Sequence, residues 1–316
     1  LKTIDGADPP GPTLEQISKK TDLSVYALEV LLEVADSADV ITRADGNLAL
    51  TKTGAIVLYD KMTQVNIDFV HDVCYQGMFL LDAALATGKP AGLKVFSDAE
   101  TIYDCITELP GDVQNSWYAF DHFYSDRAFK EAAAIVFGAP VTNLLDIGGN
   151  TGKWALRCLQ HDDKVEITIA DLPGQLSRAR EEFSRTPYAG RVHYQEVDLP
   201  TGQVDWPARF DVIWMSQFLD CFPEQQIAQI LASLHPAMTA AGRVFIMETF
   251  VDRQRFEAAT YSLNAISLYF TAMANGNSRM YRSETFERIL FEQGYEIVAT
   301  HDDVGLGHTL LECRAA

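Results

Sequence analysis

The pattern of apolar positions changes along the chain, and from residue 143 onward it is typical of buried strands separated by helical stretches. Short apolar runs bounded by polar or turn residues predict strands covered on both faces, as in a parallel sheet. The helix after the first of these strands has an apolar face that begins at Trp154. The predicted strands are residues 143–147, 165–170, 192–197, 210–215, 242–248, 295–299 and 308–313, with the last inserted antiparallel. The fold class is therefore α/β, with a seven-stranded Rossmann-like sheet.

The N-terminal region has a different pattern, which predicts two helices followed by a hairpin. Residues 1–12 are rich in Pro, Gly and Asp and predict a loop. Thr13 and Gln16 have the spacing of a capping box at the start of a first helix, and a second helix begins at Ser24. An Asp-Gly turn within residues 40–51 predicts the hairpin. This order of elements predicts an N-terminal helical winged-helix domain.

The second helix of this region bears on whether the domain binds DNA. In winged-helix proteins that read DNA, such a helix enters the major groove. Here it carries Glu29, Glu33 and Asp36 and contains neither Arg nor Lys. Base recognition is therefore disfavoured, and a packing role for the domain is favoured.

Composition and charge narrow the possible partners. The chain has 316 residues, enough for two domains, and a formal net charge of −19 that repels phosphate backbones. We therefore expect no nucleic-acid partner. No apolar run is long enough to span a membrane, and no signal peptide is visible, so no membrane association is expected. The five cysteines are dispersed, which indicates a cytoplasmic location and neither a disulfide framework nor a metal site.

A glycine-rich turn follows the first predicted strand of the sheet. Gly148, Gly149 and Gly152 allow tight turning and let a ligand approach the main chain. Asn150 stands where glycine would be commoner, but Asn tolerates left-handed backbone better than most residues. Such a turn presents backbone N–H groups to a nucleotide-like ligand. The alternative is a strand-to-helix turn whose glycines serve packing only.

Acidic residues end the next two predicted strands. Asp171 follows the second strand, at an offset from Asp146 close to the roughly 20 residues expected for a ribose-binding acid. Asp198 follows the third strand, where its carboxylate could accept a bond from an adenine amino group. Two acidic strand ends after a glycine-rich turn predict one adenosine-containing ligand.

These segments carry a resemblance to a known family. The sequences Asp-Ile-Gly-Gly-Asn-Thr-Gly, Asp-Leu-Pro and Val-Asp-Leu, at residues 146–152, 171–173 and 197–199, resemble those of S-adenosylmethionine-dependent O-methyltransferases of the caffeic-acid and hydroxyindole type. The resemblance covers nearly the whole chain, and the Asp-Leu-Pro segment is fairly specific to this group.

The resemblance implies a cofactor, a partner and a division of the chain. The cofactor would be S-adenosyl-L-methionine, and residues 1–105 would form a winged-helix dimerisation domain that pairs two subunits in a homodimer. Residues 106–316 would form the methyltransferase domain, which transfers a methyl group to an oxygen of a small aromatic acceptor. The family often has Lys at the position of Ser216, so one donor contact differs here. The implied cofactor-binding residues are Gly148, Asp171, Leu172, Asp198, Leu199 and Ser216.

The segment after the fourth predicted strand departs from the family. When Phe222-Pro223-Glu224 is matched to the family's Trp-Pro-Asp, Asp220 stands where the catalytic histidine belongs. Histidine suits proton removal from a phenol because its pKa is near neutral. An aspartate could act as the base only if its surroundings raised its pKa, or if the acceptor were already acidic. Glu248, which matches an acid that flanks the family's histidine, would complete a carboxylate pair, or else merely cap a strand end.

Two further segments are candidates for the acceptor site. An aromatic-rich helix at residues 117–126 lies just before the first predicted strand of the sheet, and its rings either wall a flat acceptor or pack between domains. In the family the matching helix lies over donor and acceptor, and a helix like that at residues 261–269 lines the acceptor pocket. The candidate substrate-binding residues are His122, Phe123, Asn264 and Leu268.

Two other functions stay open from the sequence. A chain of this fold could bind S-adenosylmethionine and perform chemistry other than methyl transfer, because a fold does not fix a function. A winged-helix regulator that senses a small ligand is the other alternative, and the acidic charge argues against it.

Overall fold

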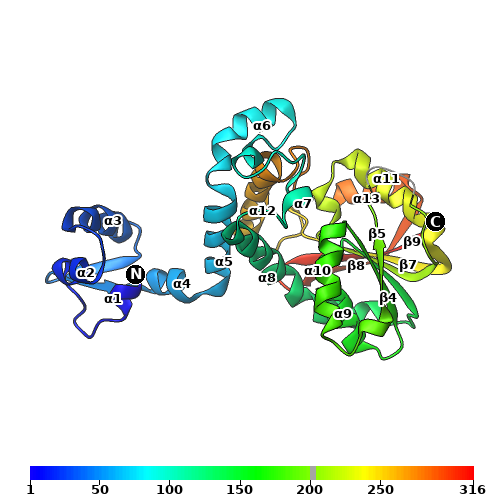
Figure 1. Ribbon diagram of the computed structural model, residues 1–316, viewed down its shortest axis with the longest axis horizontal. Coiled ribbons are helices and arrows are strands. Elements are labelled where there is room, and N and C mark those ends of the chain that lie inside the picture. Colours follow the sequence, from blue (N-terminus) through cyan, green and yellow to red (C-terminus); the bar gives the residue numbers. More distant parts are fainter. Residues whose placement is uncertain (200–203) are drawn as a thin grey trace. The chain divides into compact units, whose positions relative to one another are not determined.

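The computed structural model describes residues 1–199 and 204–316, and the chain divides into two compact units, Leu1–Val70 and His71–Ala316 (Figure 1). The predicted functional boundary between residues 105 and 106 stays a prediction.

The first unit contains the predicted order of two helices and a hairpin. Both hydrogen bonds of the capping box form, because Thr13 N donates to Gln16 Oε1 at 2.8 Å and Gln16 N donates to Thr13 Oγ1 at 3.3 Å. The hairpin turn places Asp45 and Gly46 in left-handed backbone, with φ of 51° and 79°. The elements are α1 (Lys2–Asp5), α2 (Leu14–Lys20), α3 (Val25–Ser37), β1 (Ile41–Ala44), β2 (Asn47–Leu50), α4 (Lys52–Tyr59) and α5 (Lys61–Asp68).

The first twelve residues correct one detail of the sequence analysis. We predicted a loop, whereas Lys2–Asp5 form the short helix α1. Ile4 is buried in the same cluster as Ile17 and Leu48. Packing in this core therefore stabilises a helical turn that the local sequence does not predict.

The second unit begins with short helices and continues with alternating strands and helices. A π-helical segment, η1 (Phe69–Cys74), crosses the division between the units. The other early helices of the second unit are η2 (Gly77–Leu80), α6 (Leu81–Thr87), η3 (Ala91–Val95), α7 (Ile102–Cys105) and the long α8 (Gly111–Val136). The strands are β3 (Asn143–Ile147), β4 (Glu166–Asp171), β5 (Val192–Glu196), β6 (Phe210–Ser216), β7 (Met238–Glu248), β8 (Tyr295–Val304) and β9 (His308–Ala315). The later helices are α9 (Lys153–His161), α10 (Pro173–Ser184), η4 (Ala189–Arg191), η6 (Leu219–Cys221), α11 (Glu224–Leu234), η7 (His235–Ala237), α12 (Glu257–Tyr269), η8 (Phe270–Ala274) and α13 (Ser283–Glu292).

The seven predicted strands form one sheet, which confirms the predicted fold class. The strand order is β5-β4-β3-β6-β7-β9-β8. The first five strands of this order are parallel, and β9 runs antiparallel to both of its neighbours. The predicted antiparallel insertion of the last strand is therefore confirmed.

Helices cover both faces of the sheet (Figure 1). Residues of α8, α9 and α10 bury their apolar side chains against one face, and residues of α11 and α13 bury theirs against the other. On the first face, the rings of Trp154 and Trp214 stack with centroids 3.8 Å apart. Because the central strands are buried on both sides, their apolar runs are continuous rather than alternating.

The parallel part of the sheet places its candidate residues at one edge. Parallel strands end at the same edge of a sheet, where open α/β folds bind their ligands. Gly148 follows β3, Asp171 ends β4, Ser216 ends β6 and Glu248 ends β7. Among the described residues, none of the helices has the length and apolar character needed to cross a membrane.

Candidate functional site

The glycine-rich turn between β3 and α9 has the left-handed backbone that its sequence predicts. Gly148, Asn150 and Gly152 have φ of 67°, 51° and 79°. A Cβ on Gly148 would lie 2.3 Å from the ring of Phe218, so a larger residue would have to displace that ring. At Gly149 it would lie 2.8 Å from Oδ2 of Asp146. Left-handed backbone and the short distances to neighbouring side chains together explain why glycine occupies these positions of the turn.

Asp171, at the end of β4, accepts hydrogen bonds from the backbone on both sides of its carboxyl group. Its Oδ2 accepts from Asn150 N at 2.8 Å, and its Oδ1 accepts from Leu172 N at 2.7 Å. Burial raises the pKa of Asp171 to about 6, and these two N–H donors oppose the rise. Asp171 thus joins the tip of β4 to the glycine-rich turn.

The other predicted cofactor residues have different surroundings. Asp198 lies two residues beyond the end of β5 and is exposed, whereas Leu199 is buried among apolar residues on the α11 face of the sheet. Leu172 is half-buried. Ser216 ends β6, and its Oγ is buried without a hydrogen-bond partner. Gly148, Asp171 and Ser216 therefore lie at one edge of the sheet, and among these three the Asp171 carboxyl group is bonded to the glycine-rich turn.

The two predicted catalytic carboxyl groups lie in the loop after β6, which contains Asp220, and at the end of β7, which is Glu248. Asp220 lies in η6 and is 5% exposed, and Glu248 is 1% exposed. Glu248 Oε1 accepts hydrogen bonds from Phe218 N at 3.1 Å and Leu219 N at 2.9 Å. Its Oε2 is buried and has no partner. Glu248 therefore holds the backbone that carries Asp220.

The electrostatic setting of this pair favours protonated carboxyl groups. Burial raises the pKa of Asp220 to about 7, and the negative charge of Asp121 adds to the rise. Burial and repulsion by Asp220 hold the pKa of Glu248 well above the ordinary range for glutamate. The Cys221 thiol donates to Asp220 Oδ1 at 3.5 Å. Among the ion pairs of the described residues, none joins Arg or Lys to either carboxyl group.

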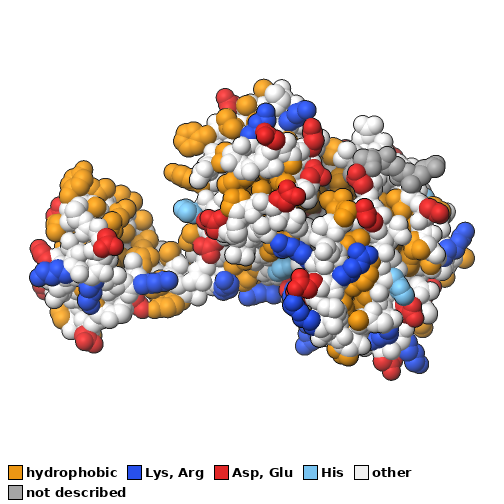
Figure 2. All heavy atoms as spheres, viewed as in Figure 1, with side chains coloured by type: hydrophobic (Ala, Val, Ile, Leu, Met, Phe, Trp, Pro, Cys, Tyr) orange, Lys and Arg blue, Asp and Glu red, His pale blue; other side chains and the backbone are white. Residues whose placement is uncertain are grey.

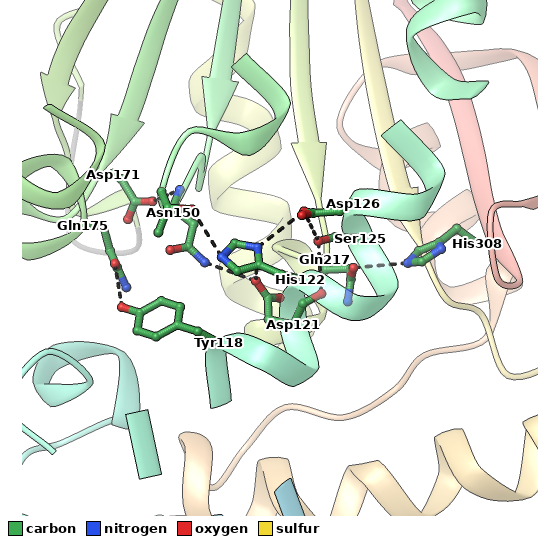
Figure 3. A network of polar contacts seen from close by, with 11 residues as sticks. Tyr118, Asp121, His122, Ser125, Asp126, Asn150, Asp171, Gln175, Gln217 and His308 are labelled. Carbon is green, nitrogen blue, oxygen red and sulfur yellow. Dashed lines mark hydrogen bonds and ion pairs between the residues drawn. The ribbon is translucent and has the colours of Figure 1, made fainter. Parts of the chain in front are cut away.

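Helix α8 contributes a polar network that faces the glycine-rich turn (Figure 3). Asn150 Nδ2 donates to Asp121 Oδ2 at 3.2 Å, and Thr151 Oγ1 lies 3.3 Å from His122 Nε2. The other ring nitrogen of His122 lies 3.5 Å from Asp126 Oδ1. Burial by itself lowers the pKa of His122, but the two neighbouring carboxylates outweigh it and raise the pKa. His122 therefore lies beside the turn, as part of a charged cluster.

The remaining predicted acceptor residues do not gather with His122. Phe123 is half-buried, and the Arg127 guanidinium lies 4.0 Å from its ring centroid. Asn264 and Leu268 are both exposed on α12. The buried side chain of this helix is that of Tyr269, whose hydroxyl accepts from Trp117 Nε1 at 2.8 Å.

Sequence reasoning missed several residues of the site. The sequence predicts a role for His122 but not for its neighbour Asp121, and for Asn150 it predicts only the backbone conformation. Gln217 has a left-handed φ of 47° directly after Ser216, and its Oε1 lies 3.2 Å from Nε2 of the fully buried His308. Asp121 precedes the predicted His122, and Gln217 follows the predicted Ser216. A polar residue next to a predicted site residue is a signal that could have identified both. No local signal singles out His308.

Similarity to known proteins agrees with this geometry. A family model described as an O-methyltransferase domain matches residues 127–296, more than half of the chain. The L-tyrosine C(3)-methyltransferase of Streptomyces lavendulae is 22% identical over 290 residues, covering 90% of this chain and 78% of that protein. The 3-hydroxy-5-methyl-1-naphthoate 3-O-methyltransferase of Streptomyces sahachiroi is 24% identical over 242 residues, covering 75% and 68%.

A solved structure shows a similar fold. It is an O-methyltransferase of neocarzinostatin biosynthesis, in complex with S-adenosylmethionine and 2-hydroxy-5-methyl naphthoic acid. The TM-score is 0.74 at 18% identity, and the alignment covers 96% of this chain and 89% of that chain.

Proposed function

Because the chain belongs to the O-methyltransferase domain family, we propose that it transfers the methyl group of S-adenosylmethionine to the hydroxyl oxygen of a small aromatic molecule. The observation that supports this most directly is the glycine-rich turn joined to Asp171 at the tip of β4, the position of ribose recognition in doubly wound folds.

The residues at this edge fit the methyl donor. Asp171 offers two carboxylate oxygens for ribose hydroxyls, and the buried Ser216 Oγ needs a partner that a ligand could supply. We assign donor binding to the six residues that the resemblance to the family implies: Gly148, Asp171, Leu172, Asp198, Leu199 and Ser216. When bound, S-adenosylmethionine supplies an electrophilic methyl group on a positively charged sulfur.

We assign the role of general base to Asp220. A base whose pKa lies near the working pH is the most effective, and burial raises the pKa of Asp220 to about 7. The Asp220 carboxylate takes the acceptor's hydroxyl proton while the new oxygen–carbon bond forms and the sulfur–carbon bond breaks. Glu248 positions Asp220 by binding the N–H groups of Phe218 and Leu219.

The acceptor would lie between α8, η6 and the α12 region. An aromatic acceptor suits the rings of this region, because such pockets are mostly apolar with a few polar groups that set orientation. Trp117 Nε1 donates to the Tyr269 hydroxyl there in a partly buried contact, and Phe123 lies on the same helix as Trp117. Asn264 and Leu268 stay candidates as exposed residues of α12, where an acceptor would cover them.

A second candidate reaction is methyl transfer to a ring carbon. The relative from Streptomyces lavendulae is named for transfer to a carbon of L-tyrosine, and it aligns with 90% of this chain. Removal of a phenol proton spreads negative charge over the oxygen and the adjacent ring carbons. A base at Asp220 therefore serves either reaction, and acceptor orientation decides between them.

We also propose that the chain forms a homodimer through its first unit. Tyr26, Val30 and Val34 lie four residues apart on one face of α3, and all three are exposed. Figure 2 shows hydrophobic side chains gathered on the surface of this unit. Apolar stripes of this kind mark association surfaces. Sedimentation should show a dimer for the wild type and a monomer for Val34→Asp, whereas Glu29→Gln on the same helix should stay dimeric.

The direct test of the function uses a labelled donor. The protein is incubated with S-adenosylmethionine labelled in its methyl group and a panel of phenols, naphthols and aromatic amino acids. We expect label in one product class, and mass spectrometry with NMR identifies an oxygen-linked or carbon-linked methyl group. Donor binding without transfer to any acceptor would favour the same fold with other chemistry. Absence of donor binding, with binding to DNA at low salt, would favour a regulator.

A further inference from the structure

A second concave region lies at the C-terminal end of α8, on the side of the sheet that this helix covers. The end of α8 and the strands β7, β8 and β9 form an open cavity of about 430 Å³, a size typical of small-molecule sites. We call it the α8-end cavity. Its walls combine small or apolar side chains with charged ones: Ala134, Ile135, Ala299, Arg243, Glu312 and Arg314.

The α8-end cavity is separate from the edge of the sheet that carries the donor and base residues. Arg243 precedes Glu248 by five residues on β7, roughly 17 Å along a strand. Ala134 follows Asp121 by 13 residues on α8, roughly 20 Å along a helix. Among the described residues, those that line the cavity include none of the residues assigned to the donor, the acceptor or the base.

Arg243 is a buried cation whose protein partners satisfy it only in part. The residue is 8% exposed. Its Nη2 donates to Val136 O at 2.9 Å, whereas its Nη1 lies 3.8 Å from Glu312 Oε1, longer than the roughly 2.7–2.9 Å of a charge-assisted hydrogen bond. A guanidinium group has five N–H donors, and a buried charge is costly unless it is paired and hydrogen-bonded. Arg243 can therefore gain a closer anionic partner.

A second guanidinium group adds to the positive charge of the cavity wall. Burial lowers the pKa of Arg243, Glu312 opposes this effect, and the positive charge of Arg314 lowers the pKa further. Asp211 has a smaller effect on this pKa and does not line the cavity. Among the ion pairs of the described residues, none includes Arg314. Two guanidinium groups thus share one carboxylate in this wall, although the chain as a whole has a formal net charge of −19.

We propose that the α8-end cavity binds a small organic acid, a molecule with one carboxylate on an apolar body. The carboxylate lies between Arg243 and Arg314, because the planar fork of a guanidinium group matches the two oxygens of a carboxylate. The apolar body lies against Ala134 and Ile135 at the end of α8. The inference goes beyond the proposed function and does not rest on it.

His301 on β8 is a further polar residue of the same wall. Its Nε2 is buried and has no hydrogen-bond partner in the described part of the chain. A buried polar nitrogen without a partner is unfavourable, so a ligand oxygen that accepts from this ring gains a bond without breaking another. His301 therefore supports an acid with acceptor oxygens rather than a purely apolar ligand.

The test compares two probes that have the same shape and differ in charge. Cyclohexanecarboxylate carries the carboxylate on a saturated ring, unlike a flat aromatic acceptor, and cyclohexanecarboxamide is its neutral counterpart. Ligand-observed NMR titrations of the full chain measure both affinities. We expect the carboxylate to bind with a dissociation constant below about 1 mM and the amide to bind at least about tenfold more weakly.

Three variants locate the bound acid. Arg314→Gln, at an exposed position, should weaken cyclohexanecarboxylate at least about tenfold. Glu312→Gln should strengthen it about threefold, because the variant removes the carboxylate that competes for Arg243. Arg185→Gln is the matched control: it makes the same change of charge at an exposed arginine paired with Glu181 on α10, and it should leave the affinity unchanged. Thermal unfolding followed by circular dichroism checks that each variant is folded.

The outcomes that contradict the proposal are distinct. Absence of binding by the wild type at about 10 mM probe, or equal affinity for the acid and the amide, would overturn it. Unchanged affinity in Arg314→Gln, or an equal loss in Arg185→Gln, would show that the acid does not bind at this cavity. Weaker binding by Glu312→Gln would refute the competition for Arg243. Tighter binding of inorganic phosphate with the same dependence on Arg314 would replace the organic acid with a simple anion. Each of these results leaves the methyl-transfer proposal standing, since the labelled donor tests that reaction separately.

Discussion

Carboxyl groups stand at two strand ends of the same sheet edge, and their surroundings differ. Asp171 at the end of β4 uses both oxygens to accept backbone N–H groups. Glu248 at the end of β7 uses one oxygen in this way and leaves the other buried without a partner. Asp171 can stay ionised near neutral pH, whereas burial raises the pKa of Asp220 to about 7 and holds the pKa of Glu248 well above its ordinary range.

The different surroundings of these carboxyl groups indicate two roles at the same edge of the sheet. A carboxylate satisfied by backbone donors is a fixed acceptor, suited to binding hydroxyl groups. A buried carboxyl group whose pKa is raised toward neutrality can exchange a proton during a reaction. The β4 end is therefore suited to holding a ligand, and the β6–β7 end is suited to chemistry. Substitutions at Asp171, Asp220, Glu248 and Cys221 test this contrast.

Replacing Asp171 with Ala should have the largest effect. The variant loses two charge-assisted bonds to ribose, each worth roughly 1.5–3 kcal/mol, so affinity for S-adenosylhomocysteine should fall at least 100-fold by calorimetry. The control is Asp162→Ala, which removes the same kind of carboxyl contact to backbone at the start of β4, where Asp162 Oδ1 accepts from Lys164 N and Val165 N. Undiminished affinity in Asp171→Ala would contradict ribose recognition.

Asp220→Asn should keep donor affinity and lower turnover about 100-fold, the usual size of general-base help. In the wild type, turnover should fall as pH drops through about 7, because the Asp220 carboxylate takes up a proton and can no longer accept one from the acceptor. The Asn variant should lack this acidic limb. Near-normal turnover of the variant across the pH range would show that positioning, rather than base catalysis, drives the reaction.

Glu248→Gln should change how stability depends on pH. The pKa of Glu248 is raised in the folded protein, so the stability it contributes is present below the ordinary glutamate value and is lost as pH rises through the raised value. The Gln variant keeps an oxygen for Phe218 N and Leu219 N and cannot ionise. Its Tm should exceed that of the wild type by a few degrees at pH 8, about 2–4 °C for each kcal/mol. The difference should shrink at pH 5, and a constant difference would contradict a protonated Glu248.

Cys221→Ala should have the smallest effect. The Cys221 thiol donates to Asp220 Oδ1 and thereby lowers the pKa of that carboxyl group against the larger effect of burial. Without this donor, the acidic limb of turnover should move to higher pH, with little change in the maximal rate. Cys221→Ser retains a donor and should keep the acidic limb close to its wild-type position. A shift toward lower pH in Cys221→Ala would show that the thiol does not act on Asp220.

The sheet and the glycine-rich turn could be predicted from local sequence, and the contacts across the site could not. Strand periodicity and glycine spacing act within a few residues, so β3 through β9 and the left-handed Asn150 follow from them. The Asn150–Asp121 bond joins residues 29 positions apart in sequence, and only the packing of α8 brings them together. Asn264 and Leu268 were chosen by resemblance, although the residue of α12 that packs inward is Tyr269.

The position of β9 has a consequence for how the protein is assembled during synthesis. β9 is made after β8 but lies between β7 and β8, so β8 can join the sheet only through a strand that leaves the ribosome later. Until residues 308–315 emerge, β7 and β8 both present unpaired edges, which are sites of association between chains. Premature termination just before β9 should therefore yield a product that aggregates, although it would retain the glycine-rich turn, Asp171 and Asp220.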